Sequence, residues 1–154
     1  MKVLLFSITI TIFSLPAFAD FSGYWSGKVR LSINGDEGTE CRAQLNIEHE
    51  SNRLSLTEDS EIICGGTAVV DFPPSYSIRG HELWHADRRI GTINATRIHA
   101  LYQGSELTVV DMEQNADQTE ARFTLNVHLK DWGGQNNILE FKGTLRKLPL
   151  KEDQ

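Results

Sequence analysis

The segment His81-Glu82-Leu83-Trp84-His85 has the residue types and spacing of a zinc hydrolase motif. On a helix, the imidazoles of His81 and His85 would lie on one face and could bind one zinc ion. Glu82 would then act as general base toward a metal-bound water. In a strand, residues four positions apart are separated by about 13 Å, too far to share an ion. The chemistry of this segment therefore depends on its secondary structure.

The surrounding sequence favours a strand. Gly80 directly precedes the motif, and Pro73-Pro74 prevents a long helix from entering it from upstream. Arg88 and Gly91 stand where the extended form of the motif requires Gly and His. We therefore expect two exposed histidines on a hairpin, no bound metal or other cofactor, and no enzymatic activity. A zinc hydrolase using this segment is kept as the third hypothesis for the function.

Charge and composition exclude several other classes. The chain carries 15 Lys and Arg against 21 Asp and Glu, a net charge of −6. Phosphate binding needs clustered positive charge, so this balance argues against nucleic acid and anionic membranes as partners. The sequence contains no G-x-S-x-G nucleophile elbow and no glycine-rich phosphate loop. With 40% hydrophobic residues in 154, the chain can build the core of one domain.

Residues 1–19 have the features of a secretory signal peptide. Met1-Lys2 supplies positive charge, the run from Val3 to Leu15 is mostly apolar, and Ala17-Phe18-Ala19 forms a small-x-small cleavage site. The apolar run is shorter than the roughly 20 residues that span a bilayer. We expect cleavage after Ala19, no membrane span, and a protein that resides in a periplasm or outside the cell.

That compartment decides how the two cysteines are interpreted. Oxidising conditions favour a disulfide between Cys41 and Cys64, and the alternative is two separate buried thiols. On the chain-entropy model the bridge would stabilise the fold by roughly 3 kcal/mol. Because there is no C-x-x-C motif, we do not expect a catalytic disulfide.

The remaining sequence alternates between apolar and polar residues. In the segment 25–33 the alternate positions hold Trp25, Gly27, Val29, Leu31 and Ile33, and the segments 41–47, 121–129 and 139–145 repeat the pattern. A period of two is typical of a strand with one buried face. The segment 96–102 fits either a strand or a two-turn helix, and we favour the strand because Gln103-Gly104-Ser105 would then form a hairpin turn.

About eight to ten short strands and no long helix predict an all-β chain. We expect one domain, residues 20–148, folded as a single antiparallel up-and-down β-barrel, with a flexible tail at 149–154. Barrel closure removes exposed sheet edges. Gly27 and Gly143 occupy inward positions that suit sharp bends at barrel corners. A β-sandwich is the alternative.

Gly23-Tyr24-Trp25 places a G-x-W at the head of the first strand. This resembles the calycin superfamily, which includes lipocalins, avidins and small bacterial metalloprotease inhibitors. The resemblance implies a barrel whose closed end is crossed by Trp25, packed against Arg146 or Lys147 near the last strand. The inhibitors are also similar in having a disulfide between early strands. The family implies inhibition through an N-terminal arm, but only residues 20–22 precede the motif here.

Aromatic side chains are the candidates for binding, either inside the barrel or at its rim: Trp25, Phe72, Trp84, Phe123, Trp132 and Phe141. The inward phenylalanines either fill the interior or line a cavity, and the inward residues favour a filled core. Our leading hypothesis is a monomeric, non-enzymatic binding module for a small apolar ligand or a secreted protein partner. The second hypothesis is an inhibitor of an extracytoplasmic hydrolase, a protease or a lysozyme.

Overall fold

The computed structural model describes residues 20–57, 59–70, 75–104, 106–130 and 134–149. The expected signal peptide, and the expected tail beyond Pro149, lie outside these residues. None of the described residues belongs to a helix that is long and apolar enough to cross a membrane. The elements are twelve strands: β1 (Gly23–Ile33), β2 (Glu40–Glu50), β3 (Arg53–Leu56), β4 (Glu61–Cys64), β5 (Thr67–Val70), β6 (Ser75–Arg79), β7 (Glu82–His85), β8 (Arg88–Ile93), β9 (Arg97–Gln103), β10 (Leu107–Gln114), β11 (Glu120–Lys130) and β12 (Asn136–Leu148).

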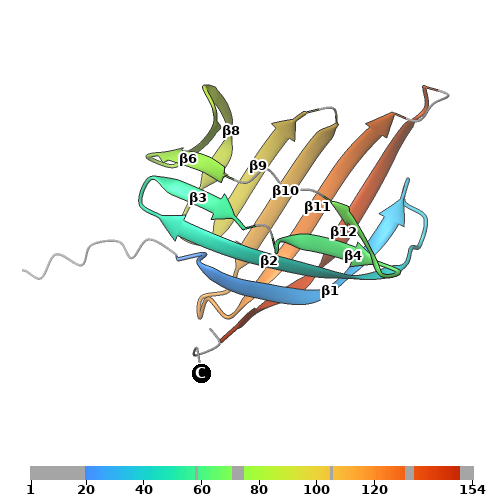
Figure 1. Cartoon of the computed structure of the whole chain (residues 1–154), viewed down its shortest axis with the longest axis horizontal. Helices are drawn as coiled ribbons and strands as arrows, with labels where there is room; N and C mark the ends of the chain where they lie inside the picture. Colours follow the sequence, from blue (N-terminus) through green and yellow to red (C-terminus); the bar gives the residue numbers. More distant parts are fainter. Residues whose placement is uncertain (1–19, 58, 71–74, 105, 131–133, 150–154) are drawn as a thin grey trace, which may run out of the picture.

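Ten of these strands form a closed antiparallel up-and-down barrel (Figure 1). The order around the ring is β1-β12-β11-β10-β9-β8-β7-β6-β3-β2, and β2 pairs with β1 to close it. The prediction of a β-barrel is confirmed, and the alternative of a β-sandwich is wrong. The two extra strands, β4 and β5, form a hairpin on the edge of β2 that also carries β3.

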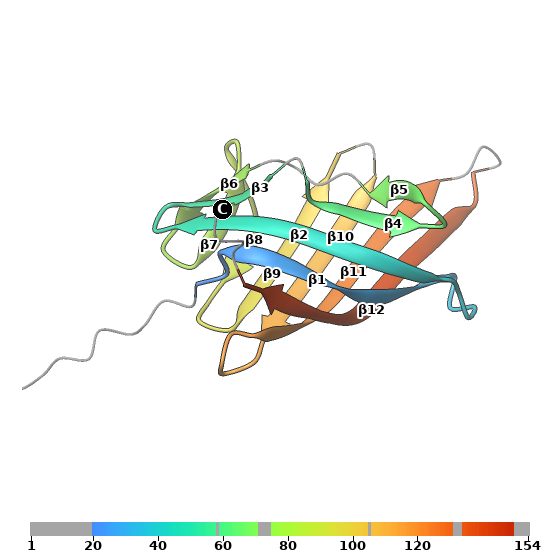
Figure 2. The same cartoon turned by 60° about the horizontal axis from the view of Figure 1, so that its bottom comes forward.

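The strand β1 closes the ring because both of its edges are paired. On one edge, residues 23–30 pair with residues 40–47 of β2, and on the other edge β1 pairs with β12. The side chain of Trp25 therefore lies between Leu45 and Lys147. Figure 2 shows β2, β1 and β12 side by side. Alternate residues of all three strands point into the barrel, as their sequence pattern predicts.

The middle of the chain forms short strands. The strand β9 confirms the choice of strand over helix for residues 96–102, and β7 and β8 form the hairpin expected at the histidine motif. The strands β4 and β6 were not predicted. Each has only four or five residues, too few for an alternation to stand out.

Two of the inward glycines allow β1 and β12 to approach each other closely. A Cβ atom on Gly27 would lie 2.1 Å from the carbonyl oxygen of Thr144, and one on Gly143 would lie 2.2 Å from that of Lys28. Such contacts are far inside van der Waals separation, so only glycine fits at these positions.

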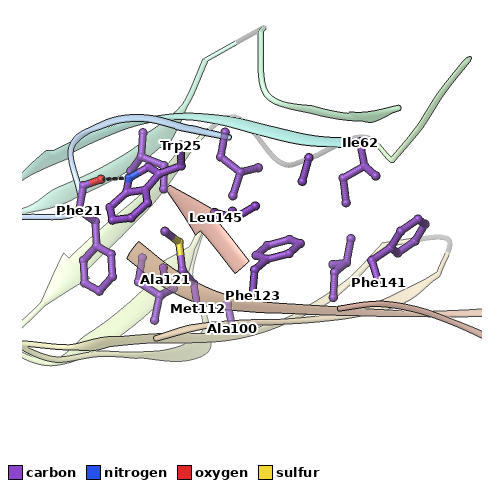
Figure 3. Close-up of a cluster of buried hydrophobic side chains, with 14 of the residues drawn as sticks. Phe21, Trp25, Ile62, Ala100, Met112, Ala121, Phe123, Phe141 and Leu145 are labelled. Carbon is purple, nitrogen blue, oxygen red and sulfur yellow. Dashed lines mark hydrogen bonds between the residues drawn. The ribbon is translucent and has the colours of Figure 1, made fainter. Parts of the chain in front are cut away.

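The interior is filled mainly by large apolar side chains (Figure 3). Trp25, Phe21, Phe123 and Phe141 are the largest side chains that are fully buried. Their burial is distributed along the barrel, with Trp25 and Phe21 at one end and Phe141 toward the other. The interior is therefore a packed core over most of its length.

The predicted disulfide is confirmed. Cys41 and Cys64 are bonded, and the bridge joins the start of β2 to the end of β4. The β4–β5 hairpin otherwise has three backbone-paired positions on β2, and Ile62 packs into the core. The bridge thus fastens the element of the sheet that has the fewest backbone partners.

We expect the double substitution Cys41→Ala and Cys64→Ala to lower the free energy of unfolding by roughly 3 kcal/mol, because the unfolded chain loses a loop closure. Urea unfolding of the exported chain would measure this. Hydrogen exchange in β10, β11 and β12 should become faster only by the loss of global stability, whereas β4 and β5 should become faster by more than that. Uniform loss of protection across the barrel would contradict the assignment of the bridge to the hairpin.

Candidate functional site

Trp25 crosses one end of the barrel. Its side chain is fully buried, and its indole Nε1 donates a hydrogen bond of 2.8 Å to the carbonyl oxygen of Phe21 (Figure 3). The ammonium nitrogen of Lys147 lies 5.4 Å from the centroid of the indole ring. A cation over an indole face contributes about 0.5–2 kcal/mol. Trp25 therefore has a structural role at the closed end.

The expectation for Arg146 is wrong, and the cation over Trp25 is Lys147. Neighbouring residues of a strand point to opposite faces, and Leu145 and Lys147 point inward. Arg146 therefore points outward, where its Nε donates to a carboxylate oxygen of Glu120 at 2.9 Å. Phe141, Gly143 and Leu145 are alternate, inward residues of β12. The same alternation predicts that the side chain at position 147, and not that at 146, points inward.

Residues 20–22 are fixed to the same end of the barrel. Phe21 is fully buried, and the Ser22 hydroxyl donates to the carbonyl oxygen of His49 at 3.2 Å and accepts from its backbone N–H at 3.0 Å. Partial burial alone would raise the pKa of Asp20, but hydrogen bonds from Ser22 and the charge of Lys147 outweigh it and hold this pKa below its ordinary value. The segment is therefore part of the barrel and does not form the free N-terminal arm that the inhibitor resemblance implies.

The contacts of Trp25 with the Phe21 carbonyl oxygen and the Lys147 ammonium predict that Trp25 contributes more to stability than Trp84 does. Trp25→Phe should lower the free energy of unfolding by about 2–4 kcal/mol, because it leaves a buried carbonyl without its donor and leaves a void. Trp84→Phe is the matched control and should cost less than about 1 kcal/mol, since the Trp84 indole Nε1 is buried without a hydrogen-bond partner and its removal breaks no hydrogen bond. Guanidinium unfolding measures both, and equal losses would contradict the assigned roles.

An apolar cavity of about 40 Å³ lies inside the barrel. Ten of its eleven lining residues have apolar side chains, and the eleventh is a tyrosine. The lining consists of Leu45, Ile47, Leu54, Leu56, Tyr76, Leu83, Ile98, Ala100, Val110, Met112 and Phe123. Among the predicted aromatic candidates, Phe123 lines this cavity, whereas Phe141 is buried elsewhere in the core. The expectation of a filled core thus holds for most of the interior and fails at this one place.

A cluster of three rings includes the cavity's tyrosine. The His85 ring lies 6.2 Å from the Tyr76 ring and 5.2 Å from the Tyr102 ring, edge-on to both. The His85 Nδ1 lies 3.3 Å from the carbonyl oxygen of Ser75, so this nitrogen is the donor. Burial, followed by the nearby Tyr102, raises the pKa of Tyr76 well above its ordinary value, so its hydroxyl stays protonated. The rings of Tyr76, His85 and Tyr102 bring the polar side chains closest to the cavity.

The raised pKa of Tyr76 predicts a loss of stability at alkaline pH. Above about pH 10 the unfolded tyrosine releases its proton and the folded one retains it, so the free energy of unfolding falls by at most about 1.4 kcal/mol per pH unit. Below that pH the group has no effect. Urea unfolding at several alkaline pH values should show a shallower slope for Tyr76→Phe than for wild type or for the outward variant Tyr24→Phe. An unchanged slope in Tyr76→Phe would contradict this role.

The histidine motif forms a turn and a strand. His81 follows Gly80 in the turn, and residues 82–85 form β7 with Leu83 buried inside. Trp84 points outward, with the Arg79 guanidinium carbon 4.5 Å from its ring centroid, and Glu82 pairs with Arg89 at 3.1 Å. Within the described residues, no three His, Cys, Asp or Glu side chains gather as metal ligands. The helix that the zinc hydrolase hypothesis requires is replaced by an extended chain.

Phe72 and Trp132 lie outside the described residues. A hollow of about 260 Å³ at the Trp25 end has Ile78 and Ile93 in its lining, together with polar residues that include His81. Tyr76 and Tyr102 were missed by the sequence analysis, although each occupies an inward position of a short strand. The apolar cavity, with Tyr76 in its lining, is the candidate site.

Comparison with known proteins adds no assignment. No model of a known protein family matches the chain, and no curated protein matches it in sequence.

Proposed function

We propose that this protein is a non-enzymatic binding module of calycin-like architecture that holds a small apolar ligand inside its barrel. The observation that carries this proposal is the interior cavity, whose lining offers a single polar side chain, Tyr76. A cavity of this kind stays dry, because water would find too few hydrogen-bond partners, and so it favours an apolar guest. We further propose that the protein is exported and acts as a monomer, which its disulfide and closed ring of strands support.

The cavity limits the size of the ligand. Pockets that enclose a drug-sized molecule measure about 300–1,000 Å³, much more than the 40 Å³ found here. The guest is therefore a few heavy atoms in size, or the end of an alkyl chain. Met112 lines the space with a flexible side chain, which allows a modest expansion around such a guest.

The hypothesis of hydrolase inhibition receives no comparable support. Its mechanism in the resembling inhibitors uses a free N-terminal arm, and here Phe21 is buried and Ser22 is bonded to His49. We therefore do not propose it.

The test of the proposed function follows the methyl group of Met112 during titration with 1-pentanol. Met112 is the single methionine after Met1, so a ¹³C-methyl-labelled exported chain gives one signal from the cavity wall. We expect a saturable shift of this signal, because the alkyl chain occupies the cavity. Absence of a saturable shift would contradict the proposal.

Two alanine variants locate the binding. Ala100 lines the cavity, and Ala121 is equally buried but lies outside the lining. Ala100→Val should fill the cavity and abolish the shift, whereas Ala121→Val should retain it at temperatures where thermal melts show both variants folded. Equal responses of the two variants would place the binding elsewhere.

A further inference from the structure

Four basic side chains gather on the outer face of three adjacent strands. Lys142 on β12, Lys28 and Arg30 on β1, and Arg42 on β2 all point outward and are exposed. These strands lie side by side in Figure 2. We call these four residues the basic patch. It is an unexpected feature in a chain whose net charge is −6.

The pairing of the strands places like charges directly opposite each other. Arg30 is the cross-strand partner of Lys142, and Lys28 is the cross-strand partner of Arg42. Like charges in directly opposite positions of a sheet are destabilising. The Arg30–Lys142 and Lys28–Arg42 pairs are thus repulsive, although the other edge of Arg30 faces Glu40 of β2.

Carboxylates compensate this patch only in part. Glu40 forms an ion pair with Lys28 at 2.8 Å, and both side chains are largely exposed. Within the part of the chain that the structure describes, no carboxylate oxygen lies within 4 Å of the charged nitrogens of Arg30, Arg42 or Lys142. By contrast, the neighbouring Arg122 and Arg146 are each paired with a glutamate. Three adjacent cations thus remain available to an anionic partner.

A groove adjoins the basic patch. Its volume is about 590 Å³, and its lining comes from β9, β10, β11 and β12, with Lys142 at the edge shared with the patch. Thr124, Asn126 and Thr144 contribute hydroxyl and amide groups to the lining. The acidic groups there are engaged: Asp111 accepts from Arg97 and lies 3.1 Å from His99, and Glu113 pairs with Arg122. The groove therefore combines neutral hydrogen-bonding groups with Lys142, a cation that could pair with an anionic ligand.

We infer that the basic patch and the adjoining groove bind a linear anionic polysaccharide. The hydroxyl groups of such a chain would pair with the Thr and Asn side chains, and its carboxylates or sulfates would pair with Lys142, Arg30 and Arg42. This surface is separate from the interior cavity, so the inference does not depend on the proposed apolar ligand.

Other anionic partners fit this surface less well. The exposed large hydrophobic side chains, which a membrane or a protein interface would use, are Ile33, Leu101, Ile138 and Leu148, and none of them belongs to the basic patch or lines the groove. The patch also lacks an aromatic side chain, on which the bases of single-stranded nucleic acid stack.

The experiment measures binding of the exported chain to heparin and polygalacturonate in low-salt buffer, with neutral dextran as the uncharged control. We expect saturable binding to at least one of the two anionic polymers, weakening as salt is added, and none to dextran. Arg30→Gln with Lys142→Gln should weaken binding about tenfold, since each exposed ion pair contributes a factor of up to about five.

A second double variant controls for net charge. Arg53→Gln with Arg89→Gln removes two exposed cations from β3 and β8, so the net charge changes by the same amount. Measured at about 0.1 M salt, where charges more than about 10 Å apart are largely screened, it should change the dissociation constant by less than about threefold. Equal weakening by both double variants would overturn the inference, since it would show only a general effect of charge.

Two further arms separate the polysaccharide from simpler partners. Inorganic sulfate at the same charge concentration as heparin should not compete, because a single anion engages only one part of the surface. Competition by sulfate, or binding to phosphatidylglycerol vesicles in place of the polymers, would overturn the inference. Failure to bind either anionic polymer in low salt would also overturn it, and would leave the pentanol test of the interior cavity unaffected.

Discussion

The structure depends on the pairing of β1 along both of its edges. This pairing converts a long antiparallel sheet into a ring, so the apolar faces of all the strands meet inside one enclosed space. Gly27 and Gly143 make the join possible, because any larger residue would push β1 and β12 apart. The same register puts Trp25 opposite Lys147 on the inside and Arg30 opposite Lys142 on the outside. The closed end and the basic patch are thus two consequences of one alignment.

The interior shows how a ring of short strands can be closed and still leave space. Trp25 and Phe21 fill one end, tied together by the hydrogen bond from the indole to the Phe21 carbonyl. Farther along, Ala100 contributes little volume, and the cavity opens beside it. A packed core loses stability for every void it keeps. A void lined by otherwise well-packed leucines and isoleucines is therefore a feature that an apolar guest would explain.

The fold could be predicted from the sequence because alternation reports directly which side chains share a face. Alternation succeeded for the long strands, where up to five inward positions repeat. The disulfide was predicted on other grounds, because the chain has two cysteines and the expected compartment is oxidising. Alternation failed for β4 and β6, which are too short to show a period. The cavity could not be predicted, since its lining comes from strands whose relative register is set by turns and by a bulge in β7.

The basic patch shows more clearly what amino-acid composition cannot predict. Net charge is a sum over the chain, and −6 argues correctly against a uniformly cationic surface. A cluster of cations depends instead on which residues become cross-strand neighbours. Knowing that residues 28 and 30 point outward was possible from alternation. Knowing that they would meet residues 42 and 142 required the register.

The fold itself does not require those cations. A slip of one residue would relieve the repulsion between Arg30 and Lys142, but it would also turn the inward side chains of β1 to solvent, so the core holds the register in place. The outward positions are free of that constraint, and the neighbouring ones on the same strands hold Ser26, Ser32 and Thr144. Uncharged residues of this kind would satisfy the sheet equally well at positions 30 and 142. The destabilising pair is therefore better explained by a partner outside the chain than by the packing within it.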